Sequence, residues 1–263
     1  MSDDASNPDD PLELFRALND PERRRAIERR GDFFLVEGLL GLRALVQSTH
    51  SIRCVLAAEN RAQVVLELVG RRAPIVIRSP EDVRAVTGFN FHRGVIAAVD
   101  RPTPPTVGEV AAPPARRLAV VEGVNDHENL GALFRNAAGF GIDGVILDPT
   151  AADPLYRRSV RVSMGHVLQM PWTRFAAWPD ELDDLRAHGF TVVALTPAPE
   201  AETIDQLADD PPEKTAFLVG AEGPGLSEAA LTTADRRVRI PLSHAVDSLN
   251  VATAAAIAFH RIT

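Results

Sequence analysis

The sequence predicts an α/β protein with two domains. Short apolar segments alternate with amphipathic ones along most of the 263 residues, which is typical of strands connected by helices. This length exceeds that of a common single domain, roughly 100–200 residues. Proline and small residues gather in Arg101–Thr106 and Ala111–Pro114, which indicates a semi-rigid linker. We therefore expect a disordered leader at 1–11, a first domain at 12–100, a linker at 101–115 and a second domain at 116–263.

The first domain alternates helical and strand patterns from its start, which predicts a small α/β domain. The predicted helices are Glu22–Arg30, Leu39–Gln47, Arg61–Val69 and Pro80–Val86. The predicted strands are Phe33–Val36, Ile52–Leu56, Pro74–Ile77 and Gly94–Val99.

The second domain repeats the alternation and predicts a mainly parallel sheet covered by helices, with functional loops where the strands end. The predicted strands are Leu118–Val121, Val145–Leu147, Val167–Met170, Thr191–Leu195, Ala216–Val219 and Val238–Ile240. The predicted helices are Leu130–Gly139, Pro154 towards Met164, Asp180–His188, a short helix after Ser227, and Val251–Ile262. The last helix is almost wholly apolar until Arg261, so we expect it to be buried nearly all round.

Composition excludes several classes of protein. With 45% hydrophobic and 24% charged residues, the chain resembles an ordinary globular protein rather than a disordered one. No apolar run approaches the roughly 20 residues that span a bilayer, and the acidic N-terminus is unlike a secretory signal. The single cysteine, Cys54, lies in an apolar run and is expected to be a buried thiol, which fits a cytoplasmic protein. No metal is expected, because the histidines lack metal-ligand spacing: His127, His166, His244 and His260.

Charge is unevenly distributed along the chain. The net charge of −8 argues by itself against a nucleic-acid partner. However, residues 21–100 hold 13 arginines against 9 acidic residues, which gives this region +4. Arg23–Arg25 and Arg29–Arg30 fall on one predicted helix, where they suit phosphate binding or, equally, a solvated helix face.

Three segments of the second domain combine a strand end, a polar or glycine-rich loop and a helix start. Val120–Gly141 carries Asn129 and Arg135, and the apolar face of its helix would hold Arg135 at a set position on the sheet. Phe217–Ser227 has glycines that let the backbone pass close to a ligand. Arg239–His260 opens its helix with Ser248 and Asn250, which are both able to cap it and are expected in a dry position.

These segments resemble the three motifs of the SpoU (TrmH-like) family of RNA ribose 2′-O-methyltransferases, within the SPOUT superfamily. The motifs are, in order, Asn129-x-Gly131-x-x-x-Arg135, then Gly220-x-Glu222-Gly223-x-Gly225, then Ile240-Pro241 followed by Ser248-Leu249-Asn250-Val251. The resemblance covers the C-terminal half. It implies S-adenosylmethionine as cofactor, RNA as substrate, a deep trefoil knot and a homodimer formed by the knotted domains.

The first domain resembles the L30e-like substrate-binding domain that many members of this family carry. The shared features are Val36-Glu37-Gly38 and Phe91–Ala97, and packing at strand ends would explain them equally well. Where the family often has His-Gln-Gly, this chain has His92-Arg93-Gly94, which leaves the RNA target open. The L30e-like domain favours ribosomal over transfer RNA. Arg157, Arg158 and Arg161, with Ser163 and Met164, resemble a further family segment, for which RNA contact and a solvated helix face are both open.

By the same resemblance, the catalytic residues are Arg135, Asn129, Glu222, Ser248 and Asn250. Arg135 would engage the phosphate and ribose of the target and assist loss of the 2′-proton, in one subunit or across the dimer. A guanidinium is too basic to act as a free base, so this role requires a perturbed site or a phosphate. Asn129 would cap or orient its helix beside the ribose.

Glu222 would fix Asn129, Arg135 or its own loop by hydrogen bonds, and an ion pair with Arg239 is the alternative. Ser248 and Asn250 would contact the cofactor loop or the Arg135 region, although capping alone explains a Ser there. The expected cofactor-binding residues, through main chain and apolar contacts, are Gly220, Ile240, Leu249, Gly225 and Asn250. Outside its motif, an apolar residue such as Ile240 or Leu249 would be an ordinary core residue.

The sequence argues against two other classes of function. Gly139–Gly144 matches the dinucleotide pattern G-x-G-x-x-G, but a helix precedes it and a strand follows, so it predicts a helix C-cap and turn rather than a nicotinamide site. A non-catalytic RNA-binding protein of the knotted fold would be favoured by loss of Arg135 or Asn250, and both are present. The expected function is therefore RNA 2′-O-methylation, on ribosomal RNA or alternatively transfer RNA.

Overall fold

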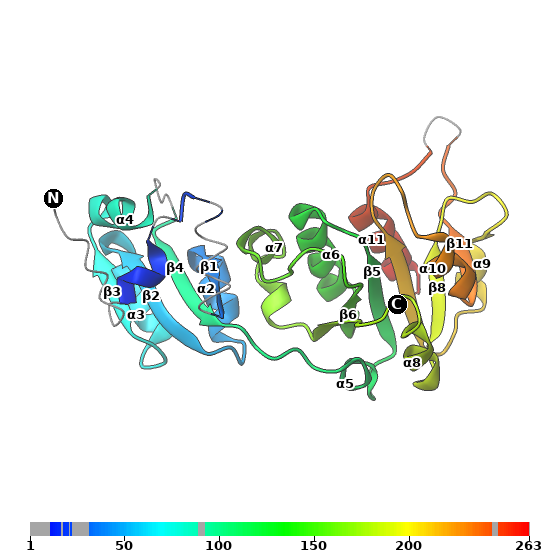
Figure 1. The fold of residues 1–263 in the computed structure, drawn as a ribbon, viewed down its shortest axis with the longest axis horizontal. Coiled ribbons are helices and arrows are strands. Elements are labelled where there is room, and N and C mark those ends of the chain that lie inside the picture. The colour runs from blue at the N-terminus through cyan, green and yellow to red at the C-terminus, as the bar shows by residue number, and fades with distance from the viewer. Residues whose placement is uncertain are drawn as a thin grey trace. The chain divides into compact units, whose positions relative to one another are not determined.

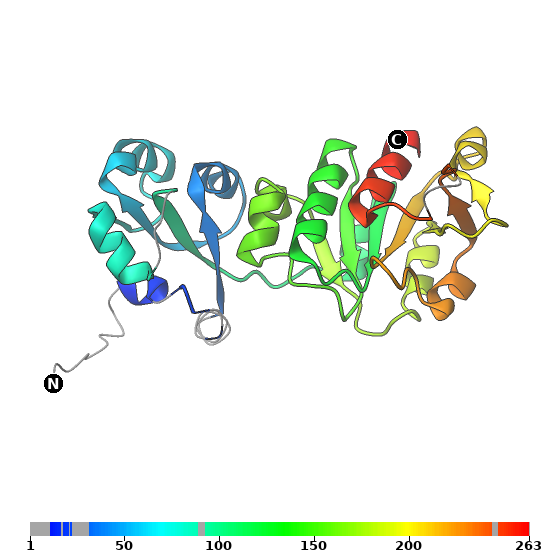
Figure 2. The same cartoon turned by 90° about the horizontal axis from the view of Figure 1, so that it is seen from above.

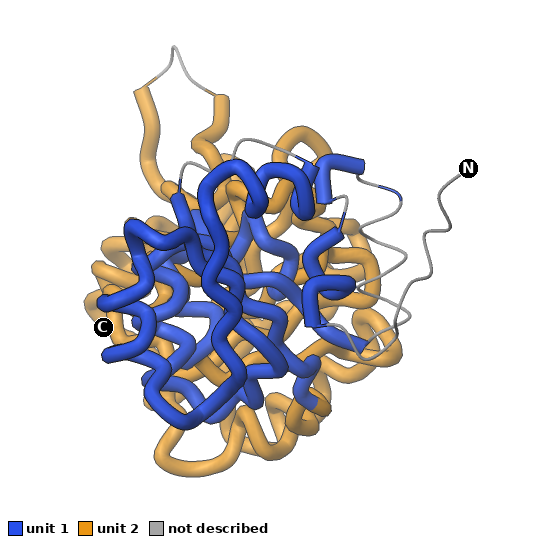
Figure 3. The backbone as a smooth tube through the Cα atoms, turned by 90° about the vertical axis from the view of Figure 1, so that its left-hand side faces the viewer, with its two compact units in different colours: residues 1–102, 155–169 blue, residues 103–154, 170–263 orange. Residues whose placement is uncertain are grey.

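The computed structural model describes residues 11–16, 18–20, 22, 32–88, 93–243 and 247–262. The expectations for a leader at 1–10, for most of the helix at Glu22–Arg30 and for His92 and His244 lie outside these residues. Two compact units form, coloured separately in Figure 3. Unit 1 comprises Met1–Pro102 and Leu155–Gln169, and unit 2 comprises Thr103–Pro154 and Met170–Thr263.

Unit 1 is built on a mixed sheet of four strands in the described part of the chain, in the order β1-β4-β2-β3. Only β2 and β3 run parallel; the other pairs are antiparallel. The strands are β1 (Phe33–Glu37), β2 (Ile52–Ala58), β3 (Ile75–Arg78) and β4 (Val95–Asp100). Among the described residues before β4, the helices are η1 (Pro11–Phe15), α2 (Gly38–Val46), η2 (Glu59–Arg61), α3 (Ala62–Val69) and α4 (Pro80–Thr87). The elements predicted over 33–99 are confirmed, and Cys54 is a free, buried thiol as expected.

Residues 155–169 confirm the helix predicted from Pro154 towards Met164 but not the strand predicted after it. They form α7 (Arg157–Val162) and η3 (His166–Leu168), so the strand predicted at Val167–Met170 is wrong, and the strand lies instead at β7 (Trp172–Arg174). Positive φ angles at Met164 (55°) and Gly165 (85°) turn the chain, and short-range bonds such as Leu168 N–H to the Gly165 carbonyl (3.0 Å) follow. Local turn chemistry therefore overrides the apolar run there.

Unit 2 contains, within the described residues, a sheet of seven strands in the order β7-β6-β5-β10-β8-β11-β9. Every neighbouring pair is parallel, as the alternation predicted. The strands besides β7 are β5 (Arg117–Glu122), β6 (Gly144–Leu147), β8 (Thr191–Leu195), β9 (Glu202–Thr203), β10 (Thr215–Gly220) and β11 (Arg236–Arg239). The helices are α5 (Val107–Ala111), α6 (His127–Gly139), α8 (Leu182–Ala187), α9 (Ile204–Asp209), α10 (Glu228–Thr233) and α11 (Val251–Ile262).

The segment expected to be a linker at 101–115 is largely part of unit 2. Thr106 and Glu109 form a capping box that starts α5, and Val110 and Ala111 are buried in the core of the unit. The density of proline in the segment obscured this short T-x-x-E pattern. The same kind of box, Thr203 with Gln206, starts α9, which was also missed.

Helices cover both faces of the sheet in unit 2. Because side chains alternate along a strand, Leu118 and Val120 of β5 face one core, which α5, α8 and α10 complete. On the other face α6 and α11 lie side by side (Figure 1 and Figure 2). The ring of Phe259 on α11 contacts that of Phe217 on β10, with centroids 5.4 Å apart.

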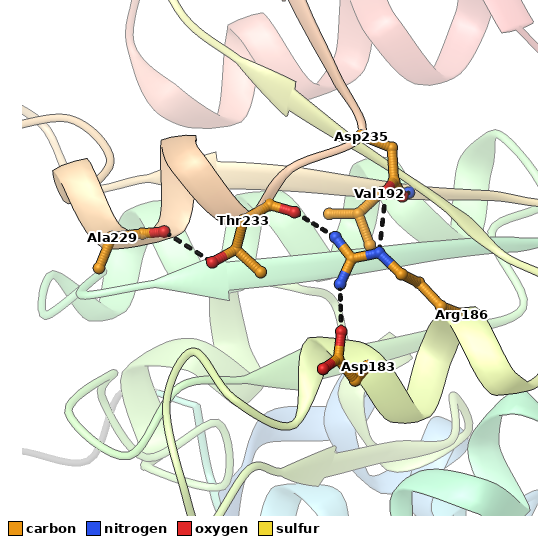
Figure 4. A network of polar contacts seen from close by, with 6 residues as sticks. All are labelled: Asp183, Arg186, Val192, Ala229, Thr233 and Asp235. Atoms are coloured by element: carbon orange, nitrogen blue, oxygen red, sulfur yellow. Dashed lines mark hydrogen bonds and ion pairs between the residues drawn. The ribbon is translucent and has the colours of Figure 1, made fainter.

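A polar network ties α8 to the connection between α10 and β11 (Figure 4). The Arg186 guanidinium donates to carboxylates of Asp183 (2.6 Å) and Asp235 (2.8 Å) and to the Thr233 carbonyl. The second oxygen of Asp235 accepts from the Val192 N–H of β8 at 2.7 Å. These hydrogen bonds raise the pKa of Arg186 against the opposing effect of its burial.

The last helix is not buried all round, which corrects the prediction. Val251, Ala255 and Phe259 are buried, whereas Thr253 and His260 are exposed and lie on the opposite side of the helix. Small apolar residues tolerate exposure, so the composition of the helix alone does not show which face is covered.

Among the described residues, no helix is long and apolar enough to cross a membrane. The same residues contain no group of three or more side chains that could together bind a metal ion.

Candidate functional site

Two of the motif loops leave the sheet at the same edge. Strands β5 and β10 are parallel neighbours, and their last residues, Glu122 and Gly220, stand opposite each other. The loops that follow them therefore start side by side at the carboxyl end of the sheet, where parallel α/β proteins bind ligands.

The glycine-rich loop after β10 is a tight turn. The Gly225 N–H donates to the Ala221 carbonyl at 3.0 Å, which leaves Glu222 at the tip. A Cβ placed on Gly220 would lie 2.4 Å from the carbonyl carbon of Gly225, so only glycine permits this close approach. Gly223 and Gly225 have φ angles of 90° and 71°, in the left-handed region that favours glycine.

The helix of the first motif starts earlier than predicted. Asp126, not Asn129, is its N-cap, and its carboxylate accepts from the N–H groups of Glu128 (2.7 Å) and Asn129 (2.9 Å). The expectation that Asn129 caps the helix is therefore wrong. Because Asp126 caps the helix, the Asn129 side chain can reach another partner.

That partner is Asn250, which joins the three motifs. Its side-chain N–H2 donates to the Asn129 oxygen at 2.7 Å and also to a carboxylate oxygen of Glu222. Its oxygen accepts from the Thr253 N–H at 3.1 Å and so caps α11, as expected. Glu222 thus fixes Asn129 through Asn250; the Glu222–Arg239 ion pair is not found among the described residues, where Arg239 donates to the Ala201 carbonyl.

A cavity of about 620 Å³ opens beside this junction. It is lined by all the predicted cofactor-binding residues: Gly220, Gly225, Ile240, Leu249 and Asn250. The whole loop from Gly220 to Leu226 contributes to its wall. Among the described lining residues, Glu222 is the one with an ionisable side chain, so the cavity combines apolar walls with one negative charge.

The remaining predicted residues occupy less enclosed positions. Ser248 lines the cavity but is exposed, as are Glu222 and Asn250, so the dry environment predicted for the helix start is wrong. Arg135 is exposed on α6 and is not among the residues that line the cavity. The described chain therefore gathers Asn129, Glu222 and Asn250 and leaves Arg135 outside the cavity.

The position of α6 relative to α11 is held by Asn136. Its side-chain N–H2 donates to the Ala252 carbonyl in the first turn of α11, at 2.8 Å. Asn136 follows Asn129 by seven residues, which is two helical turns, so both face α11. The contact between Asn129 and Asn250 is thereby supported by a second one along the same pair of helices.

A buried carboxylate supports the loop after β5. Asp148, 2% exposed at the end of β6, accepts from the Gly123 N–H at 3.0 Å and the Ala151 N–H at 2.8 Å. Arg174 donates to the Asp148 and Ala151 carbonyls at 2.5 and 2.9 Å, and burial lowers the pKa of this guanidinium. Together these residues hold the segment that leads to Asp126 and α6.

Some lining residues were missed by the sequence motifs. The strand β8 ends at Leu195, and Thr196 and Pro197 follow it; all three residues line the cavity. Their position directly after a parallel strand is the feature that could have indicated them.

Comparisons with known proteins agree with this geometry. The model of the SpoU rRNA Methylase family matches residues 116–260. An uncharacterized tRNA/rRNA methyltransferase of Mycobacterium tuberculosis is 46% identical over 99% of this chain and 91% of its own length. The 23S rRNA (guanosine(2553)-2′-O)-methyltransferase RlmP of Bacillus subtilis is 32% identical over 63% of this chain and 68% of its own length.

A solved structure supports the same relationship. The AdoMet-bound rRNA methyltransferase of Sinorhizobium meliloti superimposes with a TM-score of 0.78 and 25% identity, over 98% of this chain and 95% of that one. The matching family model, the extended similarity of sequence and the three motifs that meet at one cavity lead to one conclusion. The chain belongs to the SpoU rRNA methylase family.

Proposed function

We propose that the protein transfers a methyl group from S-adenosylmethionine to a ribose 2′-hydroxyl of RNA, with ribosomal RNA as the favoured substrate. The observation that carries the proposal is the contact of Asn250 with Asn129 and Glu222, which brings the three motifs together beside the cavity. Support also comes from the family, from the AdoMet-bound neighbour and from the 2′-O specificity in the name of RlmP.

The cavity suits this cofactor. Its volume, about 620 Å³, falls in the range of about 300–1,000 Å³ of small-molecule sites. The walls that would hold adenine are apolar: Leu195, Val219, Leu226, Ile240 and Leu249. The single carboxylate of Glu222 favours a cationic ligand, and backbone groups of the glycine-rich loop supply hydrogen bonds. S-adenosylmethionine supplies an electrophilic methyl group on a sulfonium.

The residues of the chain would position the acceptor and handle charge. Asn129 and Asn250 form one connected unit with Glu222, which holds the substrate side of the cavity in a fixed geometry. Arg135 is proposed to bind the phosphate next to the target ribose, where a bound phosphate oxygen can receive the 2′-proton. Ser248 lines the cavity and is proposed to orient the loop between β11 and α11.

The exposed position of Arg135 favours a homodimer in which Arg135 completes the site of the other subunit. Ile257 on α11 is a large apolar side chain with an exposed fraction of 36%, and we propose that this face of α11 forms part of the interface. We also propose that unit 2 is knotted, because α11 returns from β11, near the edge of the sheet, to pack on α6 and β10. An experimental electron-density map tests the knot. A C-terminal segment that is not threaded through any loop of the preceding chain would contradict the proposed knot.

Incubation of the protein with radiolabelled S-adenosylmethionine and unmodified total RNA, followed by ribose mapping, tests the reaction. Label on a ribose 2′-oxygen of ribosomal RNA is the expected result. Label on transfer RNA alone would replace the substrate class, and label on a base would overturn the 2′-O assignment. Cofactor binding by calorimetry without transfer to either RNA would favour a protein that binds RNA without modifying it.

A further inference from the structure

Glu122 is a buried carboxylate that does not line the cavity. Its exposed fraction is 8%, and it ends β5 at the edge where the site lies. One carboxylate oxygen accepts from the Trp178 indole N–H and the Ser227 hydroxyl, both at 2.6 Å. The other oxygen accepts from the Ser227 N–H at 2.9 Å. Burying a carboxylate is unfavourable unless the group is hydrogen-bonded, and these three donors offset that cost.

Glu122 holds both ends of the glycine-rich loop. The loop begins at Gly220, which stands opposite Glu122 in the β5–β10 pair. It ends at Ser227, whose N–H and hydroxyl bond the Glu122 side chain and whose oxygen also caps α10 by accepting from the Ala230 N–H at 3.2 Å. One residue therefore sets where the loop starts, through its backbone, and where it finishes, through its carboxylate.

The loop between these ends forms one wall of the cavity. Its closure by the Gly225 N–H and the Ala221 carbonyl, at 3.0 Å, makes the turn a rigid unit, so moving its end displaces its tip. The tip carries Glu222, which contacts Asn250. The position of Ser227 is thus transmitted to both the backbone around the cavity and the motif junction.

We propose that Glu122 is a positioning residue for the methyl donor: its carboxylate clamps Ser227 and thereby keeps the glycine-rich loop in the shape that binds the cofactor. This inference rests on the proposed use of S-adenosylmethionine. Trp178 supplies the third hydrogen bond and holds the carboxylate in the orientation that faces Ser227.

The substitution Glu122→Gln removes this clamp with little change in volume. A carboxamide has one acceptor oxygen, and its N–H2 would face a donor of Ser227 or Trp178. A buried donor left without an acceptor costs enough to release the loop, so the Kd for S-adenosylmethionine should rise about tenfold. Ser227→Ala removes one of the same bonds from the other side and should weaken binding in the same direction. Ser227→Thr keeps the hydroxyl and should bind within about twofold of the parent protein.

The test is calorimetric titration of S-adenosylmethionine into the full-length protein and these variants, well below the unfolding temperature of each. Both substitutions break the same clamp. The double variant Glu122→Gln with Ser227→Ala should therefore lose less binding free energy for S-adenosylmethionine than the sum of the losses in the two single variants. Thr233→Val is the control, since the Thr233 hydroxyl donates to the Ala229 carbonyl within α10. A merely structural role for Glu122 would lower the unfolding temperature and leave the Kd at low temperature unchanged.

The outcomes separate the inference from the function on which it rests. If the parent protein does not bind S-adenosylmethionine, the proposed donor is wrong and the inference falls with it. If the parent binds and Glu122→Gln binds equally well, the donor stands and the role of Glu122 is refuted. If Glu122→Gln does not fold, Ser227→Ala decides: an unchanged Kd refutes the clamp, and a raised Kd that Ser227→Thr restores supports it.

Discussion

Asn250 performs two tasks with one side-chain amide. Its oxygen caps α11, and its N–H2 bonds Asn129 and Glu222. An amide is needed because the position requires an acceptor on one side and a donor on the other. Ser or Asp could cap the helix equally well, so the donor half of the amide is what connects this residue to the proposed function.

Asn250→Asp should separate the two tasks. The carboxylate keeps the cap but cannot donate, and it repels Glu222, so methylation should fall by about 100-fold or more. The free energy of unfolding should change little. Asn250→Ala should lose the activity and also about 1 kcal/mol of stability, because the cap disappears. Methylation assays and denaturant titrations on both variants provide the comparison, and an active Asn250→Asp protein would refute the role of the donor.

Arg135→Ala should abolish transfer without affecting the donor site. Arg135 is exposed and does not line the cavity, so the Kd for S-adenosylmethionine should stay within about twofold while the methylation rate falls about 10²–10³-fold. Arg116→Ala is a suitable control, since this exposed arginine pairs with Glu213 just before β5, at the other end of that strand. Normal turnover by Arg135→Ala would remove this residue from the mechanism.

At the scale of elements, the glycine-rich loop depends on a backbone approach that side chains would block. Gly220 packs directly against the backbone of Gly225 and Leu226. Gly139, by contrast, ends α6 with open space around the position of a Cβ and has no positive φ angle. The two glycines look alike in the sequence, and their surroundings distinguish them.

Gly220→Ala should therefore weaken cofactor binding, whereas Gly139→Ala should not. The added methyl group on Gly220 would displace the loop that forms the cavity wall, and we expect at least a tenfold rise in the Kd for S-adenosylmethionine. Gly139→Ala should leave the Kd unchanged and stabilise the protein by up to about 1 kcal/mol through helix propensity. Equal cofactor affinity in the two variants would contradict the packing argument.

At the scale of the whole molecule, the exposed side of α11 bears on assembly. Ile257 and Thr253 lie on this side, opposite the residues that pack on α6 and the sheet. An amphipathic helix of a monomer normally exposes charged or polar residues there. The apolar side chain of Ile257 thus fits the proposed dimer.

Ile257→Arg should convert the proposed dimer to a monomer, because a guanidinium would be buried without a partner at the proposed interface. Leu40→Arg is the matched control: Leu40 on α2 of unit 1 is 61% exposed and should tolerate the charge. Light scattering after size-exclusion chromatography measures both. A dimeric Ile257→Arg protein would place the interface elsewhere, and a monomeric parent protein would refute the dimer.

The sequence by itself determined the fold class, the order of most strands and helices, and several of the residues that line the cavity. Period and turn chemistry are local properties, so the strands from Phe33 to Val99 and the capping role of Asn250 could be predicted from neighbouring residues. The predictions for short elements were wrong because their local signals are weak. At α5 the surrounding prolines obscured the helix start, and at η3 the apolar run indicated a strand.

Only the tertiary structure decided which distant residues meet. The contact between Asn129 and Asn250 joins positions 121 residues apart, and the clamp between Glu122 and Ser227 joins positions 105 apart. Such contacts follow from the parallel order of the strands, which sets the loops side by side, and no local pattern encodes that order. The exposed face of α11 was decided in the same way, because burial depends on what packs against a helix and not on its composition alone.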